Sequence, residues 1–306
     1  MEATGASRAQ HKLFCRVFKA VQSLAVLIST VLALGAALAW GTSDFLGGVT
    51  SRRLPLLWVL LFTQFVGLAV VLPFGLTRGA PPLDANAVLA AVLGSLSGLV
   101  GVAGLYRAIA LGVGSVAAPI SATGAALPVL FGLIRGEPTT TLQEIGMVCA
   151  LVGVIAASRT GEEQTHLGQN ARLGIVCAVV AAFGFGGFFI LLHEASTVDV
   201  LWAVAVQRAT GCVVLALLVS IRRPRLAMRR RDVPTLVLVG SLDQLANVLY
   251  GFASTLGLVS LSAVLASLYP MVTVVLARVV LEERISRVQT SGVALALTGV
   301  ALVAGH

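Results

Sequence analysis

The sequence predicts an all-α integral membrane protein with ten transmembrane helices in two five-helix inverted repeats. Its composition, its succession of long apolar runs and an internal repeat each support this fold class. Of the 306 residues, 58% are hydrophobic and 11% are charged, and the mean hydropathy is +0.97. Soluble domains use roughly 45–50% apolar and 25% charged residues. The chain is therefore far too apolar for a soluble protein.

The positive charge of the chain raises the alternative of a nucleic-acid partner. The net charge is +8 and the pI is near 10.2. However, the basic residues lie mainly in the N-terminal tail and in short connections between apolar runs, which is typical of membrane proteins. We therefore expect the lipid bilayer, and no nucleic acid, as a partner. The cysteines show no metal-type spacing, so we expect neither a metal nor a cofactor; they are Cys15, Cys149, Cys177 and Cys212.

The apolar runs follow a polar, basic tail at residues 1–22. The first run is longer than the core of a signal peptide and is followed by further runs, so we interpret it as an uncleaved helix. Each run is long enough to cross a bilayer, which takes roughly 17–25 residues. Each must be helical because its backbone groups have to be satisfied within the segment. The ten runs are 24–44, 55–76, 86–109, 115–134, 141–158, 172–192, 200–221, 234–256, 260–281 and 287–304.

An internal repeat divides these runs into halves of five. The segment YRAIALGVGS from Tyr106 resembles YGFASTLGLVS from Tyr250, and ALVGV at 150–154 resembles ALTGV at 296–300. Positions in the second run of each half also align at a constant offset. The aligned residues are Trp58, Gln64 and Gly67 with Trp202, Arg208 and Gly211.

The odd number of helices in each half has a mechanical consequence. The second half enters the membrane from the opposite side and must lie inverted relative to the first. Many secondary transporters are built this way, with the substrate site between the repeats near the midplane and alternating access around it. The sequence therefore predicts transport. The expected domains are a tail at 1–22, a first repeat at 23–158, a linker at 159–171 and a second repeat at 172–304.

Several stretches resemble the EamA-type ten-helix transporters of the drug/metabolite transporter superfamily. They are ALAWGTSDF in the first run, APISATGAALPVLFGLIRGE in the fourth, and ASLYPMVTVVLARVVLEERIS with QTSGVALALTGVAL at the end. The resemblance covers residues 24–304. It implies a transporter, often an exporter of amino acids, metabolites or toxic compounds. We expect a multi-pass protein of the inner or plasma membrane, from a bacterium.

The same resemblance implies that both termini lie in the cytoplasm. The distribution of Lys and Arg favours the opposite, because the side of the N-terminal tail carries about six of them and the other side about twelve. The loop at 222–231 contributes strongly to the second count. The sequence leaves both orientations open.

A polar stripe in the run 234–256 is the first candidate for the substrate site. Asp243, Asn247 and Tyr250 lie at i, i+4 and i+7, so a helix places them on one face. An Asp at a helix centre costs about 2.5–3.5 kcal/mol of insertion free energy, so this face must avoid lipid. The stripe either lines a hydrated cavity, contacting a substrate or a coupled proton, or provides a structural ion pair from Asp243. The expected partner of such a pair is Arg208 or Arg107.

Prolines in the fourth and ninth runs give a second pointer. Proline removes a backbone donor and frees a carbonyl, and interrupted segments at matching positions of two halves are typical of transporter binding sites. The alternative is an ordinary kink packed by small residues. The prolines are Pro119, Pro128 and Pro270, and the polar residues near them are Ser121, Thr123, Ser267 and Tyr269.

Two residues of the first run and one of the third complete the candidate cavity. Trp40 provides either an aromatic wall or a membrane-interface anchor. Asp44 is either a gate or cation-attracting group or a solvated end of the helix. Tyr106 is included because it occupies the position in the first half that Tyr250 has in the second.

Two glutamates and two glycine pairs are interpreted as structural. Glu137 and Glu283 lie where one helix ends and the next begins, and a carboxylate is favoured at a helix N-terminus. The pairs Gly94/Gly98 and Gly132/Gly136 suit close helix packing and offer a surface for a homodimer. All six lie within the two repeats.

Other function classes find little support in the sequence. No His-Glu-x-x-His, Ser/His or paired-Asp arrangement and no phosphate-binding loop is present, so we expect no enzyme; no segment resembles a channel filter. The remaining alternatives to a carrier of small solutes are a non-transporting membrane protein and a flippase for a lipid-linked substrate. The histidines lie in tails and loops: His11, His166, His193 and His306.

Overall fold

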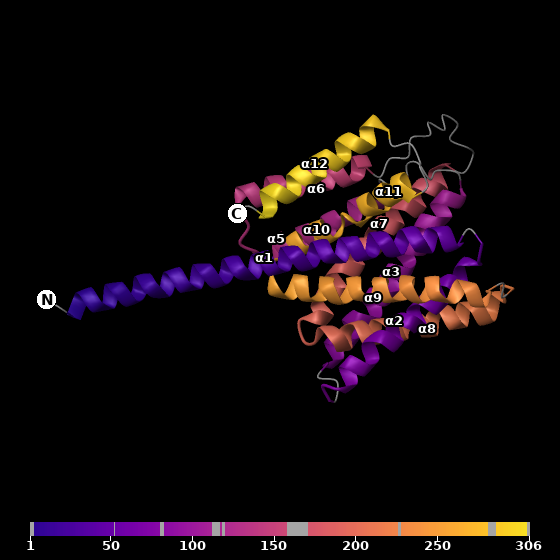
Figure 1. Cartoon of the computed structure of the whole chain (residues 1–306), viewed down its shortest axis with the longest axis horizontal. Helices are drawn as coiled ribbons and strands as arrows, with labels where there is room; N and C mark the ends of the chain where they lie inside the picture. The colour runs from indigo at the N-terminus through magenta and orange to yellow at the C-terminus, as the bar shows by residue number, and fades with distance from the viewer. Residues whose placement is uncertain are drawn as a thin grey trace.

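The computed structural model describes residues 3–304 apart from 52, 80–82, 112–116, 118–119, 158–170, 226–227 and 281–285. It describes only the backbone of residues 3–22, 109–110, 171, 274, 277–278 and 304. The described residues form helices and connections, without a strand (Figure 1). Two short 3-10 helices are η1 (Thr123–Ala125) and η2 (Arg230–Asp232). The α-helices are α1 (Ala3–Ser51), α2 (Leu56–Leu76), α3 (Ala85–Ala110), α5 (Ala126–Ile134), α6 (Thr141–Ala157), α7 (Ala171–Ser196), α8 (Val200–Arg222), α9 (Val233–Leu256), α10 (Val259–Ala266), α11 (Tyr269–Val280) and α12 (Arg287–Ala304).

Ten apolar helical segments lie at the ten apolar runs of the sequence. Six of those described are long and apolar enough to cross a membrane by themselves, and four are shorter, with 10–17 residues. The six are Ser23–Ser51, Leu56–Leu76, Ala85–Ala108, Arg172–Ser196, Val200–Arg222 and Arg230–Leu256; the four are Ile120–Ile134, Thr141–Ala157, Val259–Thr273 and Arg287–Val303.

Two of the expected helix boundaries are wrong. The run 260–281, expected as one helix, is divided into α10 and α11 by a turn at Ser267 and Leu268. Pro270 is the second residue of α11, where its missing N–H breaks no helical hydrogen bond. Its ring would clash with the preceding turn of a regular helix, which favours an interruption just before it. The first helix, expected to end at residue 44, continues to Ser51. Its polar residues near position 44 indicated an interface but face the protein interior.

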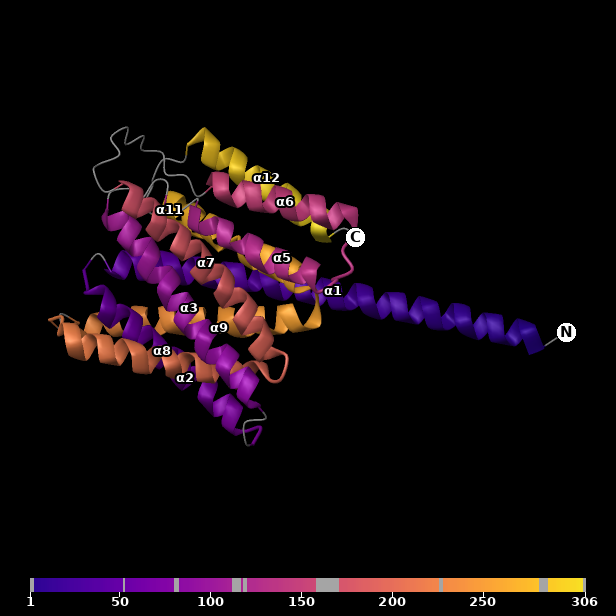
Figure 2. The same ribbon diagram turned by 180° about the vertical axis from the view of Figure 1, so that it is seen from behind.

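The pairing of helices follows a pseudo-two-fold symmetry. The first helix of each half packs along the third helix of the other half, as α1 does with α9 and α3 with α7. The second, fourth and fifth helices pack against their own counterparts, namely α2 on α8, α5 on α10 and α6 on α12. Exchanging the two halves leaves every pair unchanged, so the two-repeat arrangement is confirmed. Figure 1 and Figure 2 show α6 and α12 side by side at one edge of the bundle.

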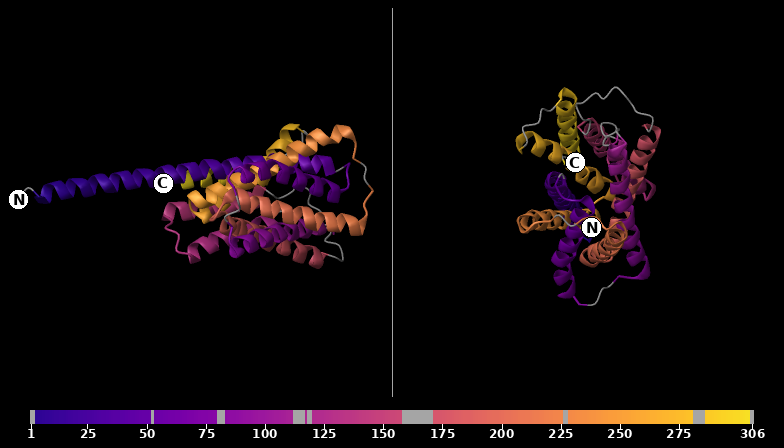
Figure 3. Two further views of the ribbon diagram at one scale, coloured as in Figure 1. Left: turned by 90° about the horizontal axis from the view of Figure 1, so that it is seen from below. Right: turned by 90° about the vertical axis from the view of Figure 1, so that its right-hand side faces the viewer.

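The N-terminal part of α1 extends well beyond the other helices (Figures 1 and 3). Within the bundle, α1 packs along α9, α10 and α11. Its place between these elements brings the segment from Trp40 to Gly48 to the centre of the molecule, where it lines a cavity.

The glycine pairs divide into two kinds. Gly94 and Gly98 face α7 of the same chain, because a Cβ at either position would lie 3.3 Å from Leu191 Cβ or 3.1 Å from Phe188 Cδ2. Gly132 faces Glu137 and Ser260. Gly136 has a φ of +75° with open space around its Cβ position, so it ends the helix rather than packing against another. The expectation of a packing pair at 132 and 136 is therefore wrong for Gly136.

Candidate functional site

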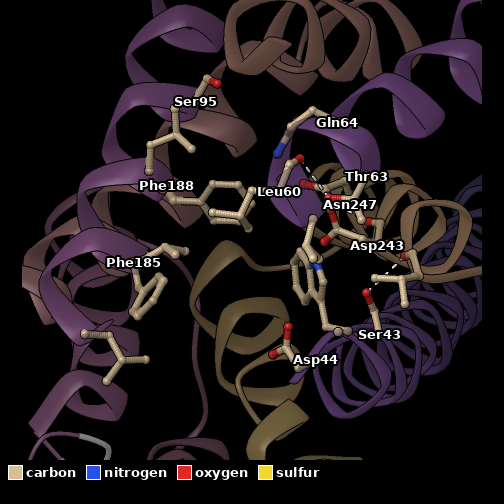
Figure 4. Close-up of a pocket in the computed structure, with 18 of the residues that line it drawn as sticks. Ser43, Asp44, Leu60, Thr63, Gln64, Ser95, Phe185, Phe188, Asp243 and Asn247 are labelled. Carbon is tan, nitrogen blue, oxygen red and sulfur yellow. Dashed lines mark hydrogen bonds between the residues drawn. The ribbon is translucent and has the colours of Figure 1, made fainter. Parts of the chain in front are cut away.

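The central cavity lies among seven helices and has a volume of about 380 Å³. Its walls come from α1, α2, α3, α7, α8 and α9, with Tyr269 at the start of α11. Small-molecule pockets are concave, mostly apolar and carry a few placed polar groups. This cavity matches that description: Figure 4 shows Phe185 and Phe188 on one side and Asp243, Asn247 and Thr63 on the other.

The cavity lies toward one end of the bundle. On α1 its lining begins at Trp40 and continues to Gly48, and on α2 it includes Leu56, the first residue of that helix. No described residue before Trp40 lines it. It therefore reaches from the middle of the bundle toward the end at which α1 stops and α2 begins, which we call the open end.

Arg208 on α8 is the centre of a buried polar network. Its side chain is 5% exposed, and its Nη1 lies 2.7 Å from Asp243 Oδ2. Nε donates to Gln244 Oε1 at 2.9 Å and Nη1 to Gln64 Oε1 at 3.0 Å. Nη2 donates to the Asp243 carbonyl at 3.3 Å. Four contacts, one of them to a carboxylate, thus engage all three nitrogens of the guanidinium, which offsets much of the cost of burying its charge.

Two glycines make room for this network. A Cβ at Gly67 on α2 would lie 3.1 Å from Gln244 Oε1 and 3.3 Å from Arg208 Nε. A Cβ at Gly211 on α8 would lie 2.8 Å from Gln64 Oε1. Each long polar side chain therefore crosses the α2–α8 contact over the glycine of the other helix. This reciprocal packing explains why the Gln-x-x-Gly and Arg-x-x-Gly positions align in the internal repeat.

The polar stripe of α9 is divided between the cavity and the core. Asp243 and Asn247 line the cavity. The Asn247 side chain donates to the Asp243 carbonyl at 2.6 Å, while its buried Oδ1 has no partner among the described residues. Tyr250 is fully buried and donates to the Phe189 carbonyl at 3.0 Å. It lies outside the cavity lining, so its expected role as a lining residue is replaced by one in packing.

An aromatic cluster closes the cavity at its inner end. The Trp40 ring lies 6.0 Å from Phe188, 5.7 Å from Phe189, 5.9 Å from Tyr250 and 6.3 Å from Tyr269, centroid to centroid. Such edge-to-face and tilted contacts add to the stabilisation from burial. Trp40 is 7% exposed and packs with the fully buried Ala36 and Ala263. We call these five aromatic residues the aromatic floor.

Asp44 lines the cavity one turn beyond Trp40. It is exposed, and no hydrogen bond or ion pair joins its carboxylate to a described residue. It lines the same cavity as Asp243, Tyr106 and Tyr269. Ser43, its neighbour, is buried at the edge of the same cavity and donates to the Val239 carbonyl of α9 at 3.0 Å.

Several candidates from the sequence lie away from the cavity. Arg107 is exposed, so Asp243 takes Arg208 rather than Arg107 as its partner. Ser267 donates to the Val264 carbonyl and Thr123 to that of Ile120. Pro119 and Glu283 lie outside the described residues, as does most of the expected linker at 159–171. Three further candidates are buried and do not line the cavity: Ser121, Pro128 and Ser267.

The structure adds residues that sequence reasoning did not select. They are the polar Thr63, Gln64, Ser95 and Gln207 and the aromatic Phe185 and Phe188. Gln64 carried a usable signal, since it aligns with Arg208. The others are single polar or aromatic residues within apolar runs, and only the helix packing shows which face is inward.

At the end opposite the open end, a glutamate of the first repeat caps the N-terminus of a helix in the second repeat. Glu137, just after α5, accepts hydrogen bonds from Val259 N, from Ser260 N at 3.1 Å and from Ser260 Oγ. These donors belong to the first turn of α10, whose orphan N–H groups and dipole favour a carboxylate. Glu137 was expected to serve the next helix in its own half, but it serves the N-terminus of a helix in the other half.

Replacing Glu137 by Ala should lower the thermal stability of the purified protein. The change leaves two N–H groups and a hydroxyl of α10 without their acceptor, which should cost about 1–3 kcal/mol. Melting in detergent, followed by intrinsic fluorescence, measures the effect. Glu144→Ala is the matched control, because Glu144 is exposed and accepts only from Thr139 among the described residues. Equal melting temperatures for the two variants would contradict the role of Glu137.

Comparison with known proteins agrees with the two-repeat architecture. A model of the EamA-like transporter family matches residues 27–159 and again residues 172–305. The chain belongs to the EamA-like transporter family. It is thus a multi-pass membrane protein of the drug/metabolite transporter superfamily.

One solved structure shares the fold of this chain over nearly its whole length. A structure named "Crystal structure of protein" is 20% identical in sequence, with a TM-score of 0.74. The similarity covers 90% of this chain and 95% of that chain. No curated protein matches the sequence. Within the described part of this EamA-like chain, no group of three His, Cys, Asp or Glu lies close enough to hold a metal ion.

Proposed function

We propose that this EamA-like protein is a secondary transporter that exports a small solute by alternating access through the central cavity. The observation that carries the proposal is a cavity of about 380 Å³ between the two repeats, reaching toward one end only. A site at the interface of two related halves can be exposed to either side when the halves rock against each other.

The barrier below the cavity consists of contacts between the two repeats, and such rocking would break them. The aromatic floor joins α1, α7, α9 and α11, and the Glu137 cap joins the loop after α5 to α10. Arg135 adds a contact to Glu194 at 3.4 Å on the same side. These groups lie in both repeats, so a rotation of one half against the other would break them together. The turn between α10 and α11, next to Tyr269 and Pro270, supplies a break in the backbone beside the floor.

Flux measurements in proteoliposomes test the proposal. Protein reconstituted into vesicles should show saturable uptake or release driven by a solute gradient, and counterflow of a labelled solute when the unlabelled solute is inside. The screen should cover amines, amino acids, nucleosides, sugars and organic acids. Protein-free vesicles supply the background rate. No saturable flux for any class would contradict a carrier of small solutes and favour a non-transporting protein, while movement of a labelled lipid between leaflets would favour a flippase.

A further inference from the structure

Asp44 is the only unbalanced charge among the described residues that line the cavity. Three of these residues carry formal charge: Asp44, Arg208 and Asp243. Arg208 and Asp243 neutralise each other through the contact at 2.7 Å. The Asp44 carboxylate, exposed to the cavity, has no counter-ion among the described residues. With its carboxylates ionised, the cavity therefore carries a net negative charge.

The cavity also lacks a free positive group for an anionic ligand. The guanidinium of Arg208 is already bound by Asp243, Gln64 and Gln244. A substrate carboxylate would have to displace Asp243, which would leave that carboxylate without a partner inside the bundle. Such a displacement is costly because a charge held inside the bundle without a counter-ion has lost most of its solvation and gained no partner.

Several aromatic side chains line the cavity together with the unbalanced carboxylate. Trp40 lies one turn before Asp44 on α1, and Tyr106 on α3 and Tyr269 on α11 line the same cavity. Figure 4 shows Asp44 on one side of the cavity with Phe185 and Phe188 across from it. Aromatic faces attract ammonium groups through their quadrupoles, most strongly where water is excluded. Carboxylate and rings together thus favour a cation with apolar substituents.

A second observation points to a ligand in the same cavity. Asn247 is 1% exposed and lines the cavity, yet its Oδ1 has no partner among the described residues. Gln207 is 4% exposed and lines it too, with its Nε2 likewise unpartnered in the described part of the chain. Buried polar atoms in native proteins nearly always have partners. A bound molecule with a polar N–H or O–H group would supply one to the Asn247 oxygen.

We propose that the cavity selects an organic cation, an amine whose ammonium group binds between Asp44 and the aromatic rings, over anions and zwitterions. The inference names the substrate class of the proposed transporter and so rests on that function for its role in transport. The binding site itself follows from the charges and contacts of the cavity.

A set of ligands with one shape and different charge tests this selection. Phenethylamine is the cation, 2-phenylethanol the neutral form, phenylalanine the zwitterion and 3-phenylpropionate the anion; further aliphatic amines of similar size extend the first class. Binding to the purified full-length protein is measured by calorimetry at mildly alkaline pH, where carboxylates are ionised. We expect saturable binding of amines, with the other three classes weaker by roughly tenfold or more, the value of one charge-assisted hydrogen bond.

Variants at position 44 assign the selection to one group. Asp44→Asn should weaken amine binding by roughly tenfold or more, whereas Asp44→Glu, which keeps the charge, should retain it. Unchanged amine binding in Asp44→Asn, failure of every amine to bind, or equal binding of phenylalanine would each overturn the inference. Melting temperatures of both variants near that of the unmodified protein are the control for folding.

Charged thiol reagents give a readout that depends on no particular ligand. In a protein with Leu60→Cys and its native cysteines replaced by Ala, a trimethylammonium methanethiosulfonate should react faster than its sulfonate analogue. Leu60 lines the cavity, as Figure 4 shows. The preference should fall in the same protein with Asp44→Asn, and equal rates before that change would overturn the inference.

The outcomes separate the two proposals. Selective amine binding at Asp44 without any flux in vesicles would contradict the transporter but support the amine site. Saturable flux of an anion, a zwitterion or a neutral solute, with no preference for amines, would support the transporter and overturn the amine site.

Discussion

Replacing Arg208 by Ala is expected to be the most destabilising single change in the polar network. The change leaves the Asp243 carboxylate, which lies 2.7 Å from the guanidinium, without its counter-ion. It also removes the donors of Gln64 Oε1 and Gln244 Oε1. Removing one partner of a buried ion pair costs about 3–5 kcal/mol. We expect a large drop in melting temperature and in the yield of folded protein in detergent.

A double-mutant cycle separates the pair from the rest of the network. Asp243→Asn alone should cost less, because Gln64, Gln244 and the backbone carbonyl of residue 243 still accept from Arg208 and the side chain of Asp243 is 26% exposed. Adding Asp243→Asn to Arg208→Ala should recover part of the lost stability, since no unpaired carboxylate remains. If the two losses simply add, the contact between Arg208 and Asp243 does not stabilise the fold and the interpretation of the network is wrong.

Replacing Trp40 by Ala is expected to have the largest effect on the barrier below the cavity. The side chain is 7% exposed and contacts four other aromatic rings. Truncating a buried tryptophan of this kind costs about 3–5 kcal/mol and leaves a cavity. We therefore expect lower thermal stability, and loss of solute retention against a gradient because water enters the packed region beneath the floor.

Accessibility of a buried thiol measures this effect. Ala263 on α10 is fully buried and packs with Trp40 below the cavity. In a protein with Ala263→Cys and no other cysteine, a water-soluble maleimide should react slowly. Adding Trp40→Ala should raise the rate, while Trp40→Phe, which keeps a ring at the position, should raise it far less. Equal rates with Trp40→Ala and Trp40→Phe would show that the ring of Trp40 does not seal the floor.

Much of the fold could be predicted from patterns in the chain. Ten apolar runs predict ten membrane-embedded segments. A continuous apolar segment crosses hydrocarbon as a helix, because its backbone groups must be hydrogen-bonded within the segment. The internal repeat, with Gln64 and Gly67 aligned to Arg208 and Gly211, indicated two related halves. Errors arose where a local signal has two meanings. Polar residues around Asp44 mark either a helix end or an inward face, and the structure places them on an inward face of a longer helix.

The candidate site was less accessible to sequence reasoning. The stripe on α9 was identified by its spacing, but spacing alone cannot show where along the helix the cavity ends. Asp243 and Asn247 lie in the lining whereas Tyr250, two turns below Asp243, lies in the floor. Pro270 correctly marked a break before α11, whereas Pro128 lies inside the continuous helix α5. The polar residues beside the break, apart from Tyr269, bond to their own helix or are buried outside the cavity.

The sequence by itself determined the environment, the helical class and the duplication of this protein, because hydropathy, segment length and repeat spacing are properties of the chain that hold in any packing. Only the tertiary structure decided which charges are balanced. Arg208 and Arg107 were equal candidates for Asp243, and the crossing of α8 over α2 at Gly67 brings the first to the carboxylate. The same packing leaves Asp44 facing the cavity without a counter-ion among the described residues. Sequence spacing could not show this, because any counter-ion would come from a helix that is distant in the chain.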